Sequence, residues 1–344
     1  MATLGRLAWP RGPGAFRLWL ALLVVFHHVT RVEVGMAPVL VFFMLSGFWV
    51  YRVWHARYVA TRNPWLTFVV SRWWRIAPLL MLASVLGFMA QYATGDVGWS
   101  IARAMPLREA LSAVFALGYA DLPQRAVGPG WSLDIEMQFY LLAPLLVALV
   151  SRVSAPMALA LGLTGTCLAI VGGAGLSFGS FAFVFVLGMV AARHEWQAGM
   201  ALGSAGLLAA VLAVVVAQMV RPWGDIWDGD GKRAAFNIVL AVLMAPCALA
   251  TARRKTDGTD AVMGDQSYLV YILHWPFVTL LRAWAPGLWG FVAGAGVLVA
   301  LCLAAWRWVD RPLEGVRRAW VAGRGRAGEA GETAKKDDSA AILA

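Results

Sequence analysis

The chain has 344 residues, of which 60% are hydrophobic and only 14% are charged, and its formal net charge is +10. Soluble domains are about 45–50% apolar and about 25% charged. The composition therefore argues against a soluble domain and indicates a polytopic membrane protein.

Ten apolar runs of about 16–23 residues follow one another along the chain, and each is long enough for a hydrocarbon core about 30 Å thick. We expect an all-α fold, a polytopic bundle of about ten transmembrane helices. Residues 107–119 are shorter and more polar at their start, and they predict an interfacial or re-entrant helix. The predicted spans are residues 15–31, 36–54, 75–94, 131–150, 156–173, 177–193, 199–220, 234–251, 266–284 and 287–308.

Basic residues are distributed unevenly between the loops. With both termini in the cytoplasm, 21 of the 29 Lys and Arg residues fall inside and 8 fall outside. Cytoplasmic loops carry an excess of Lys and Arg, so we expect a multi-pass protein of the inner (cytoplasmic) membrane with both termini cytoplasmic.

The domain organisation is predicted to be simple. Residues 1–322 form one membrane domain, and the polar segment 323–344 is a disordered cytoplasmic tail because it has no apolar periodicity. We expect a retained first helix in place of a cleaved signal peptide. The charged cluster within 221–233 is interpreted as a solvated loop, with a carbohydrate-contacting rim as the alternative.

His27 and His28 lie in the middle of the apolar run 18–32. Ionisable side chains at membrane depth are costly and usually mark a functional site, although such a histidine can also be a core residue bonded to a carbonyl. Adjacent side chains point about 100° apart on a helix, so at most one ring faces a given site. Arg17 precedes His28 by eleven residues, which places His28 roughly 16 Å further along the helix.

Two arginines mark the start of the third predicted span. Arg72 and Arg75 are three residues apart in SRWWRIAP and share one helix face. Their guanidinium groups match phosphate oxygens well, so a phosphate clamp is one hypothesis. Positive-inside anchoring is the alternative.

The fourth predicted span begins with several polar residues. Asp134, Glu136 and Gln138 follow the Gly-Pro-Gly turn at 128–130, and such groups are unlikely to face lipid. Ser132 is a candidate helix cap. Three interpretations of Glu136 remain open: it orients or charge-balances a histidine, binds sugar hydroxyls, or pairs with a buried arginine.

The ninth predicted span carries Tyr271 and His274, which are three residues apart and share a face. A Tyr–His hydrogen bond that satisfies both groups is the simplest interpretation. After the last span, Asp310-Arg311-Pro312 is predicted to stop the helix. The three cysteines lie in apolar segments without metal-ligand spacing, so we expect no metal site.

Taken together, these stretches resemble the acyltransferase family 3, integral membrane acyltransferases that modify bacterial glycans and some antibiotics. The likeness covers residues 17–312, and its six elements come in the family's order. They are Arg17 with His28, FFMLSGF at 42–48 with Ser46, the Arg72–Arg75–Pro78 element, Trp131 to Tyr140, Ser267 to Pro276, and Asp310 to Pro312. The chain departs from the pattern at Asp134, Met137 and Asp310.

The resemblance implies acyl transfer from cytoplasmic acyl-CoA, usually acetyl-CoA, to a hydroxyl of a glycan or related sugar at or across the membrane. It implies that the first-span histidine is essential, which is carried to His28 with His27 as the alternative. The arginine elements would hold the CoA phosphates. Met137 stands where a second acidic residue is common in the family, so Glu136 would be the sole carboxylate in the role of that pair. Supporting or substrate-contacting roles would fall to Ser46, Trp131, Ser132, Asp134, Gln138, Tyr140, Tyr271 and His274.

We hypothesise that His28 is a general base on the acceptor hydroxyl, poised by Glu136 or another buried polar group, with transient acylation of an imidazole nitrogen as the rival. No permanently bound cofactor and no nucleic-acid partner are expected. A transporter or flippase for a glycolipid or acyl group fits the buried ionisable residues equally well, but no internal repeat is seen. A non-catalytic assembly subunit is a third class. The acceptor, the acyl chain length and the oligomeric state stay open.

Overall fold

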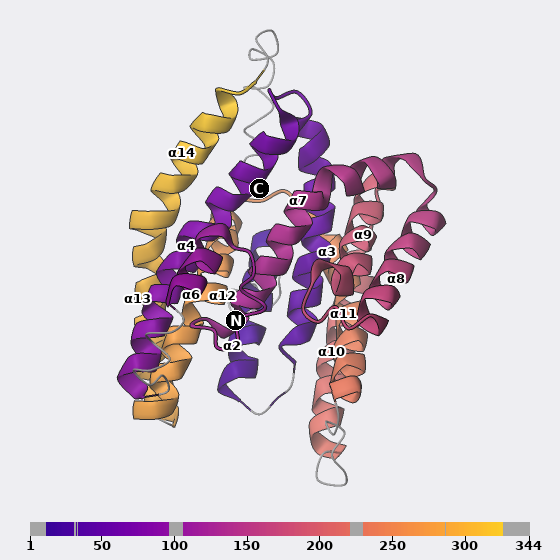
Figure 1. Ribbon diagram of the computed structural model, residues 1–344. Coiled ribbons are helices and arrows are strands. Elements are labelled where there is room, and N and C mark those ends of the chain that lie inside the picture. Colours follow the sequence, from indigo (N-terminus) through magenta and orange to yellow (C-terminus); the bar gives the residue numbers. More distant parts are fainter. Residues whose placement is uncertain are drawn as a thin grey trace.

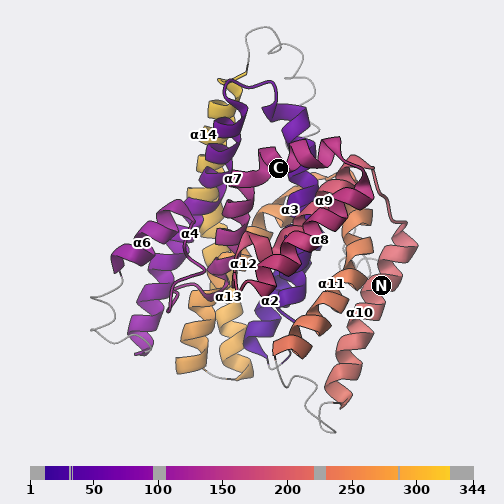
Figure 2. The ribbon, with the colours of Figure 1, turned by 45° about the vertical axis from the view of Figure 1, so that its right-hand side comes forward.

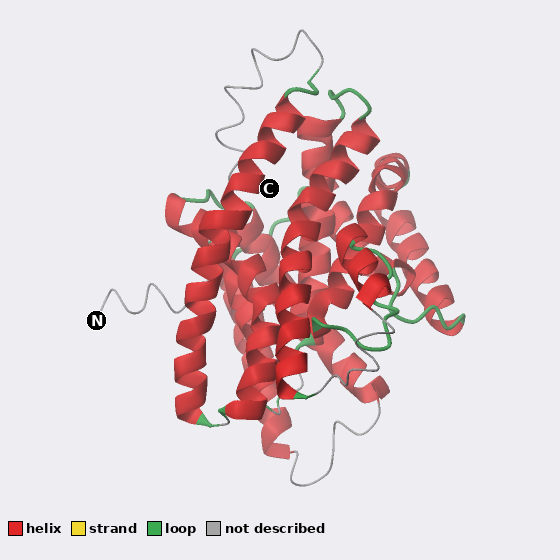
Figure 3. Cartoon of the chain, turned by 60° about the vertical axis from the view of Figure 1, so that its left-hand side comes forward, coloured by secondary structure: helices red, strands yellow, loops and turns green. Residues whose placement is uncertain are grey.

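A computed structural model describes residues 12–30, 32, 34–95, 106–220, 230–285 and 287–325; most of the predicted tail and of the 221–233 loop lie outside the described residues. Within these ranges the regular structure is helical, apart from one isolated bridge between Thr61 and Gly325 (Figures 1 and 3). The predicted all-α bundle is confirmed.

The helices follow the apolar runs of the sequence, and each of the ten predicted spans overlaps one of them. The short segment predicted at 107–119 is also helical, as α6. In chain order the helices are α2 (Pro13–Val29), α3 (Met36–Val53), α4 (Pro64–Thr94), α6 (Pro106–Phe115), α7 (Trp131–Arg152), α8 (Ala155–Val171), α9 (Phe178–Arg193), α10 (Met200–Val220), α11 (Asp230–Ala252), α12 (Gly258–Trp284), α13 (Leu288–Ala305) and α14 (Arg311–Ala322).

Six helical segments of the described chain are long and apolar enough to cross a membrane, judged by length and composition. The chain is therefore a multi-pass membrane protein. Helices α2, α8 and α9 are apolar but shorter. The six segments are Met36–Tyr58, Pro64–Thr94, Gly128–Arg152, Met200–Val220, Lys232–Ala252 and Trp289–Ala322.

The predicted helix stop at 310–312 is wrong. Residues Trp306–Asp310 form a π-helical turn that runs directly into α14, and Figures 1 and 2 show α13 and α14 in continuation. Pro312 lies in the first turn of α14, where a missing N–H removes no intrahelical bond. The Arg311 N–H bonds back to the carbonyl of Trp306, so the widened turn carries the chain past the proline.

Helices α3 and α9 approach each other closely because glycines lie at their contact. A Cβ at Gly188 would lie 1.9 Å from the carbonyl oxygen of Met44, and one at Gly47 would lie 2.0 Å from that of Phe185. Neither position has room for a side chain. This contact fixes the position of Ser46, the neighbour of Gly47 in the FFMLSGF element.

Helix α2 packs along α12, and its start is bound by a carboxylate of that helix. Asp260 accepts hydrogen bonds from the backbone N–H groups of Gly14 (3.1 Å) and Ala15 (2.8 Å). Negative charge is favourable at a helix N-terminus, where backbone N–H groups lack partners. The contact fixes the axial position of α2, and with it the position of Arg17 one turn further on.

Candidate active site

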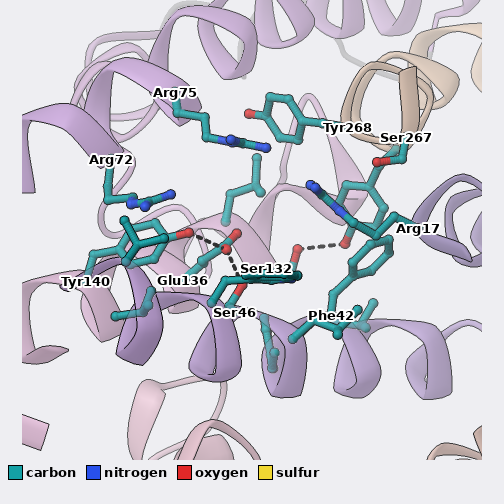
Figure 4. A pocket seen from close by; sticks show the side chains of 18 residues that line it. Arg17, Phe42, Ser46, Arg72, Arg75, Ser132, Glu136, Tyr140, Ser267 and Tyr268 are labelled. Atoms are coloured by element: carbon teal, nitrogen blue, oxygen red, sulfur yellow. Dashed lines mark hydrogen bonds between the residues drawn. The ribbon is translucent and has the colours of Figure 1, made fainter. Parts of the chain in front are cut away.

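A central pocket with about 820 Å³ of empty space lies between α2, α3, α4, α7 and α12 (Figure 4). Its polar lining residues are Arg17, Ser46, Arg72, Arg75, Ser132, Glu136, Tyr140, Ser267, Tyr268 and Tyr271. The three predicted phosphate-binding arginines therefore face one cavity, together with one carboxylate.

Arg72 is a buried cation in the wall of this pocket. Its side chain is 5% exposed, and its guanidinium carbon lies 5.3 Å, 5.7 Å and 6.0 Å from the ring centroids of Phe68, Tyr140 and Tyr58. Its Nε and Nη2 atoms have no hydrogen-bond partner in the described part of the chain. Burying an unpaired charge is costly, so this guanidinium is suited to receive an anionic group of a ligand.

Glu136 of α7 faces the arginine side of the central pocket. Its Oε1 atom accepts hydrogen bonds from Ser46 Oγ (2.5 Å) and from the hydroxyl of Tyr140 (2.6 Å), as Figure 4 shows. Ser46 comes from α3, so the carboxylate joins two helices. Two hydroxyl donors hold it in place, and it reduces the excess positive charge of the pocket.

Ser132 and Tyr271 bring α7 and α12 together at the opposite end of the pocket. Their hydroxyl oxygens lie 2.6 Å apart, and Ser132 Oγ also lies 2.9 Å from the carbonyl oxygen of Pro129. Ser132 is not the cap of α7, because the N-cap is Gly130 and has no side-chain bond. The predicted Tyr271–His274 hydrogen bond is likewise replaced by the Tyr271–Ser132 contact.

Asp134 and Gln138 lie on α7 but do not line the central pocket. Asp134 is fully buried, and it accepts hydrogen bonds from the Ala120 N–H (2.8 Å) and from Gln138 Nε2 (3.0 Å). Gln138 Oε1 in turn accepts from the N–H of Phe178 at the start of α9 (2.9 Å). These two residues join α7 to its preceding loop and to α9, so their contacts are supporting ones.

A second cavity, the histidine pocket, opens beyond Tyr271 and has about 1,100 Å³ of empty space. Tyr271 and Val39 line both this cavity and the central pocket. Trp131 packs against Phe43 and Phe181 at its side, with ring centroids 6.3 Å and 5.8 Å away. Its other lining residues are Val24, His27, His28, Gly35, Met36, Arg125, Gly128, Pro129, Arg233, Ala234, Asn237 and Trp275.

The histidine pair lies in the last turn of α2, which ends at Val29, rather than in the middle of a span. His27 Nδ1 lies 2.9 Å from the carbonyl oxygen of Val32. Because a carbonyl only accepts, Nδ1 carries the proton in this contact. The His28 ring stacks on His274 at 5.3 Å and meets Trp275 edge-on at 5.1 Å.

The structure does not bring Glu136 and His28 into one pocket. One polar neighbour of His28 from α12 is His274, which is fully buried and donates from Nδ1 to the Val270 carbonyl (3.0 Å). Its Nε2 atom is buried and has no partner in the described chain. Another is Arg282, which donates to the backbone carbonyl of His28. The polar side chains of α12 beside His28 are therefore an imidazole and a guanidinium, and the Glu136 carboxylate is not among its neighbours.

A third cavity, the mouth pocket, opens at the other end of the central pocket and has about 1,400 Å³ of empty space. The two share Arg17, Trp49, Arg75 and Tyr268. The starts of α2, α12 and α14 line the mouth pocket, whereas the end of α2 and the 125–131 segment line the histidine pocket. Three neighbouring cavities that share lining residues thus follow one another between the start of α2 and its end.

Sequence reasoning missed several residues around these cavities. Tyr58 and Phe68 form the aromatic wall behind Arg72, and Arg125 and Trp275 line the histidine pocket. Trp275 follows His274 directly, so an aromatic residue beside a buried histidine was a usable signal. Tyr58 and Phe68 had none, because they precede the predicted third span.

The described residues contain no group of three His, Cys, Asp or Glu side chains arranged to hold a metal ion. Cys247 and Cys302 are buried, as expected for small apolar side chains, whereas Cys167 is exposed on α8. None of the three lines the cavities described above.

Residues 12–307 match the model of a protein family, Acyl_transf_3, which is described as "Acyltransferase domain". Neither the curated proteins nor the solved structures contain a match to the chain. The matched range holds every residue that lines the central pocket and the histidine pocket, and it ends before α14.

Proposed function

We propose a donor, an acceptor and a route of transfer for this chain, which belongs to the Acyltransferase domain family. It is a membrane acyltransferase that moves acyl groups other than aminoacyl groups. The donor is acyl-CoA, with acetyl-CoA as the preferred form. The acceptor is a hydroxyl of a cell-envelope glycan or related sugar. The observation that carries the proposal is that Tyr271 lines both the arginine-lined and the histidine-lined cavity.

The donor lies in the mouth pocket and the central pocket. CoA carries phosphates and a long flexible arm, so it needs cations at one end and a narrow channel for the thioester. Arg17 and Arg75 line both cavities, and Arg72 presents its unpaired guanidinium further in. Guanidinium groups are well suited to phosphate oxygens.

The acceptor enters from the histidine pocket. Its wall combines imidazoles with the indole rings of Trp131 and Trp275, and the indole Nε1 of Trp275 is buried without a partner in the described chain. Aromatic faces and unpaired donors suit a ring that carries hydroxyl groups. A sugar hydroxyl held there lies beside His28, on the far side of Tyr271 from the arginines.

In the proposed reaction the acceptor hydroxyl oxygen attacks the thioester carbonyl carbon, and the carbon–sulfur bond breaks. His28 removes the hydroxyl proton as the new carbon–oxygen bond forms, and it returns that proton to the departing CoA sulfur. The Tyr271 and Ser132 hydroxyls lie where the two pockets meet. Ser132 donates its one proton to the Pro129 carbonyl, so Tyr271 donates to Ser132. In the reaction the Tyr271 hydroxyl turns this proton from Ser132 to the carbonyl oxygen and stabilises its charge. Transient acylation of the imidazole is the rival route.

The direction of transfer is from the cytoplasm outward across the inner membrane. Acyl-CoA is a cytoplasmic metabolite, so the mouth pocket faces the cytoplasm. The starts of α2 and α14 line that pocket, which agrees with cytoplasmic termini and with the excess of basic residues expected on that side.

The experiment that tests this function uses purified protein in detergent, where both ends of the cavity system are accessible. Equilibrium binding of acetyl-CoA and release of its free thiol are measured, and butyryl-CoA and palmitoyl-CoA are run in parallel. We expect the protein to bind acetyl-CoA and to release its thiol faster than that of butyryl-CoA or palmitoyl-CoA. If none of the three thioesters binds or is consumed, the donor assignment is wrong.

A further inference from the structure

Arg317 of α14 is a fully buried arginine that the route above does not use. Its side chain is 2% exposed, and its Nε and Nη2 atoms each donate to Glu314 at 2.6 Å. Its Nη1 atom donates to Ser71 Oγ on α4 at 2.7 Å. Arg317 lies beyond residue 307, where the family match ends.

Ser71 connects Arg317 to the aromatic wall behind Arg72. Its Oγ atom lies 2.8 Å from the hydroxyl of Tyr58, and both side chains are fully buried. The Tyr58 ring packs edge-on against Phe68 (5.1 Å between centroids), and the guanidinium of Arg72 lies over both rings. A continuous chain of contacts therefore runs from Arg317 through Ser71 and Tyr58 to Arg72.

A second contact joins α14 to the same region. The Arg62 N–H donates to the carbonyl of Arg324 at 2.8 Å, beside the Thr61–Gly325 bridge. The segment that carries Tyr58 is thus linked to α14 through Ser71 of α4, and its Arg62 is bonded to Arg324 just after the end of α14. Glu314 balances the charge of Arg317, so Arg317 is available to position a neighbour and not to bind an anion itself.

Arg72 depends on this support because it has few polar contacts of its own. Its Nε and Nη2 atoms have no partner among the described residues, and its guanidinium lies against the ring faces around it. A cation over aromatic faces is stabilised by their electrons but is not held in one orientation as a bidentate ion pair is. A shift of the Tyr58 ring would therefore shift the guanidinium.

We propose that Arg317 is a positioning residue which, through Ser71 and Tyr58, holds Arg72 in the orientation that binds the anionic end of the acyl donor. This inference rests on the proposed function of Arg72. Residues Arg311, Glu314 and Arg318 of α14 line the mouth pocket directly, and the path through Arg317 adds an indirect link from the same helix to Arg72 in the central pocket.

The test uses the full chain in detergent with acetyl-CoA as the varied substrate. The direct variant is Arg317→Gln, which removes a buried charge. Ser71→Ala and Tyr58→Phe each remove one link of the path and leave every charge in place, so they test the path even if Arg317→Gln fails to fold. We expect the KM for acetyl-CoA to rise about three- to tenfold, the size of one lost hydrogen bond, and kcat to stay within twofold.

The matched control is Ser84→Ala on the same helix. Ser84 is also buried and shares a hydrogen bond with a tyrosine hydroxyl, that of Tyr119 at 3.0 Å, but neither residue lines the central pocket. We expect its KM to be unchanged. A rise equal to that of Ser71→Ala would show a general loss of stability and would overturn the proposal.

Combining variants separates positioning from an independent effect. In an Arg72→Gln background, Ser71→Ala is expected to raise KM no further, because the residue it positions is gone. Full additivity, or an unchanged KM in Ser71→Ala alone, contradicts the inference while leaving the donor assignment intact. If the wild-type protein consumes no acyl-CoA, the donor assignment fails and this inference falls with it.

Discussion

The hydroxyl oxygens of Tyr271 and Ser132 lie 2.6 Å apart, and Tyr271 lines both the cavity that holds the arginines and the cavity that holds the histidines. In the proposed function, a donor bound at Arg17, Arg72 and Arg75 and an acceptor bound at His28 would meet at these two hydroxyls. The proposal therefore keeps the anionic donor and the sugar acceptor in different cavities until the thioester reaches Tyr271.

Replacing His28 by alanine is expected to lower kcat by about 100-fold or more, the usual contribution of a general base. Acetyl-CoA affinity should stay within twofold, because His28 does not line the central pocket. Single-turnover transfer from radiolabelled acetyl-CoA measures the first quantity and equilibrium binding the second. His55→Ala is the control, since His55 is exposed and outside all three cavities. Wild-type turnover in a stably folded His28→Ala protein would sink both the base and the acylation routes.

Replacing Arg72 by glutamine is expected to raise the KM for acetyl-CoA roughly tenfold or more, because a charge-assisted hydrogen bond contributes about 1.5–3 kcal/mol. kcat should change little. Arg52→Gln is a matched control: Arg52 also lies over two aromatic rings, at 5.7 Å and 5.9 Å, but lines none of the cavities. Initial rates over a range of acetyl-CoA concentrations decide the matter. A fall in kcat with unchanged KM would be incompatible with a donor clamp.

Changing Glu136 to glutamine is expected to preserve the fold and reduce turnover at least about tenfold. The amide oxygen still accepts from Ser46 and Tyr140, but the negative charge that balances the three arginines is lost. Thermal unfolding and kcat are measured on the same preparation. Glu109→Gln, in which a carboxylate bonded to a tyrosine hydroxyl lies outside the cavities, is the comparison. Equal turnover in both variants would show that the charge of Glu136 has no part in turnover.

Replacing Gly188 by alanine is expected to lower the free energy of unfolding by about 1–3 kcal/mol, the cost of overpacking a tight contact. The new methyl would meet the Met44 carbonyl and push α9 away from α3. Gly165→Ala on α8 has open space around its Cβ, and in a helix interior it should stabilise by up to about 1 kcal/mol. Thermal unfolding in detergent ranks the two. Equal stability would mean that the α3–α9 contact tolerates a side chain.

Sequence reasoning located the helices but not all of their ends. Apolar runs have to be buried or placed in lipid, so the ten predicted spans each overlap a helix. The predicted helix end at 310–312 is wrong because a π-helical turn continues the backbone into α14, with Pro312 in its first turn. Residue type alone does not reveal such a turn. Helix α4 begins at Pro64, whereas the span predicted there began at residue 75. The first turns of the helix are amphiphilic and lie outside the apolar run on which the prediction was based.

The candidate site was predicted in parts. Arg17, Arg72 and Arg75 were expected to act together, and they do line one pocket. Glu136 and His28 were grouped by the chemistry they suit, yet they lie in different cavities. Arg317 lies 246 residues from Ser71 in the sequence, and no local pattern connects it to Ser71 and Tyr58.

The sequence by itself determined that this chain is a helical membrane protein and which residue types bear its chemistry, because hydropathy and motif spacing are local properties of the chain. Which of those residues meet was decided only by the tertiary structure. The Asp260 contact sets the height of α2 beside α12, and the close approach of Gly47 to Phe185 and of Gly188 to Met44 sets the distance between α3 and α9. Side-chain neighbours across helices depend on such axial and lateral positions, and these arise from packing among segments hundreds of residues apart.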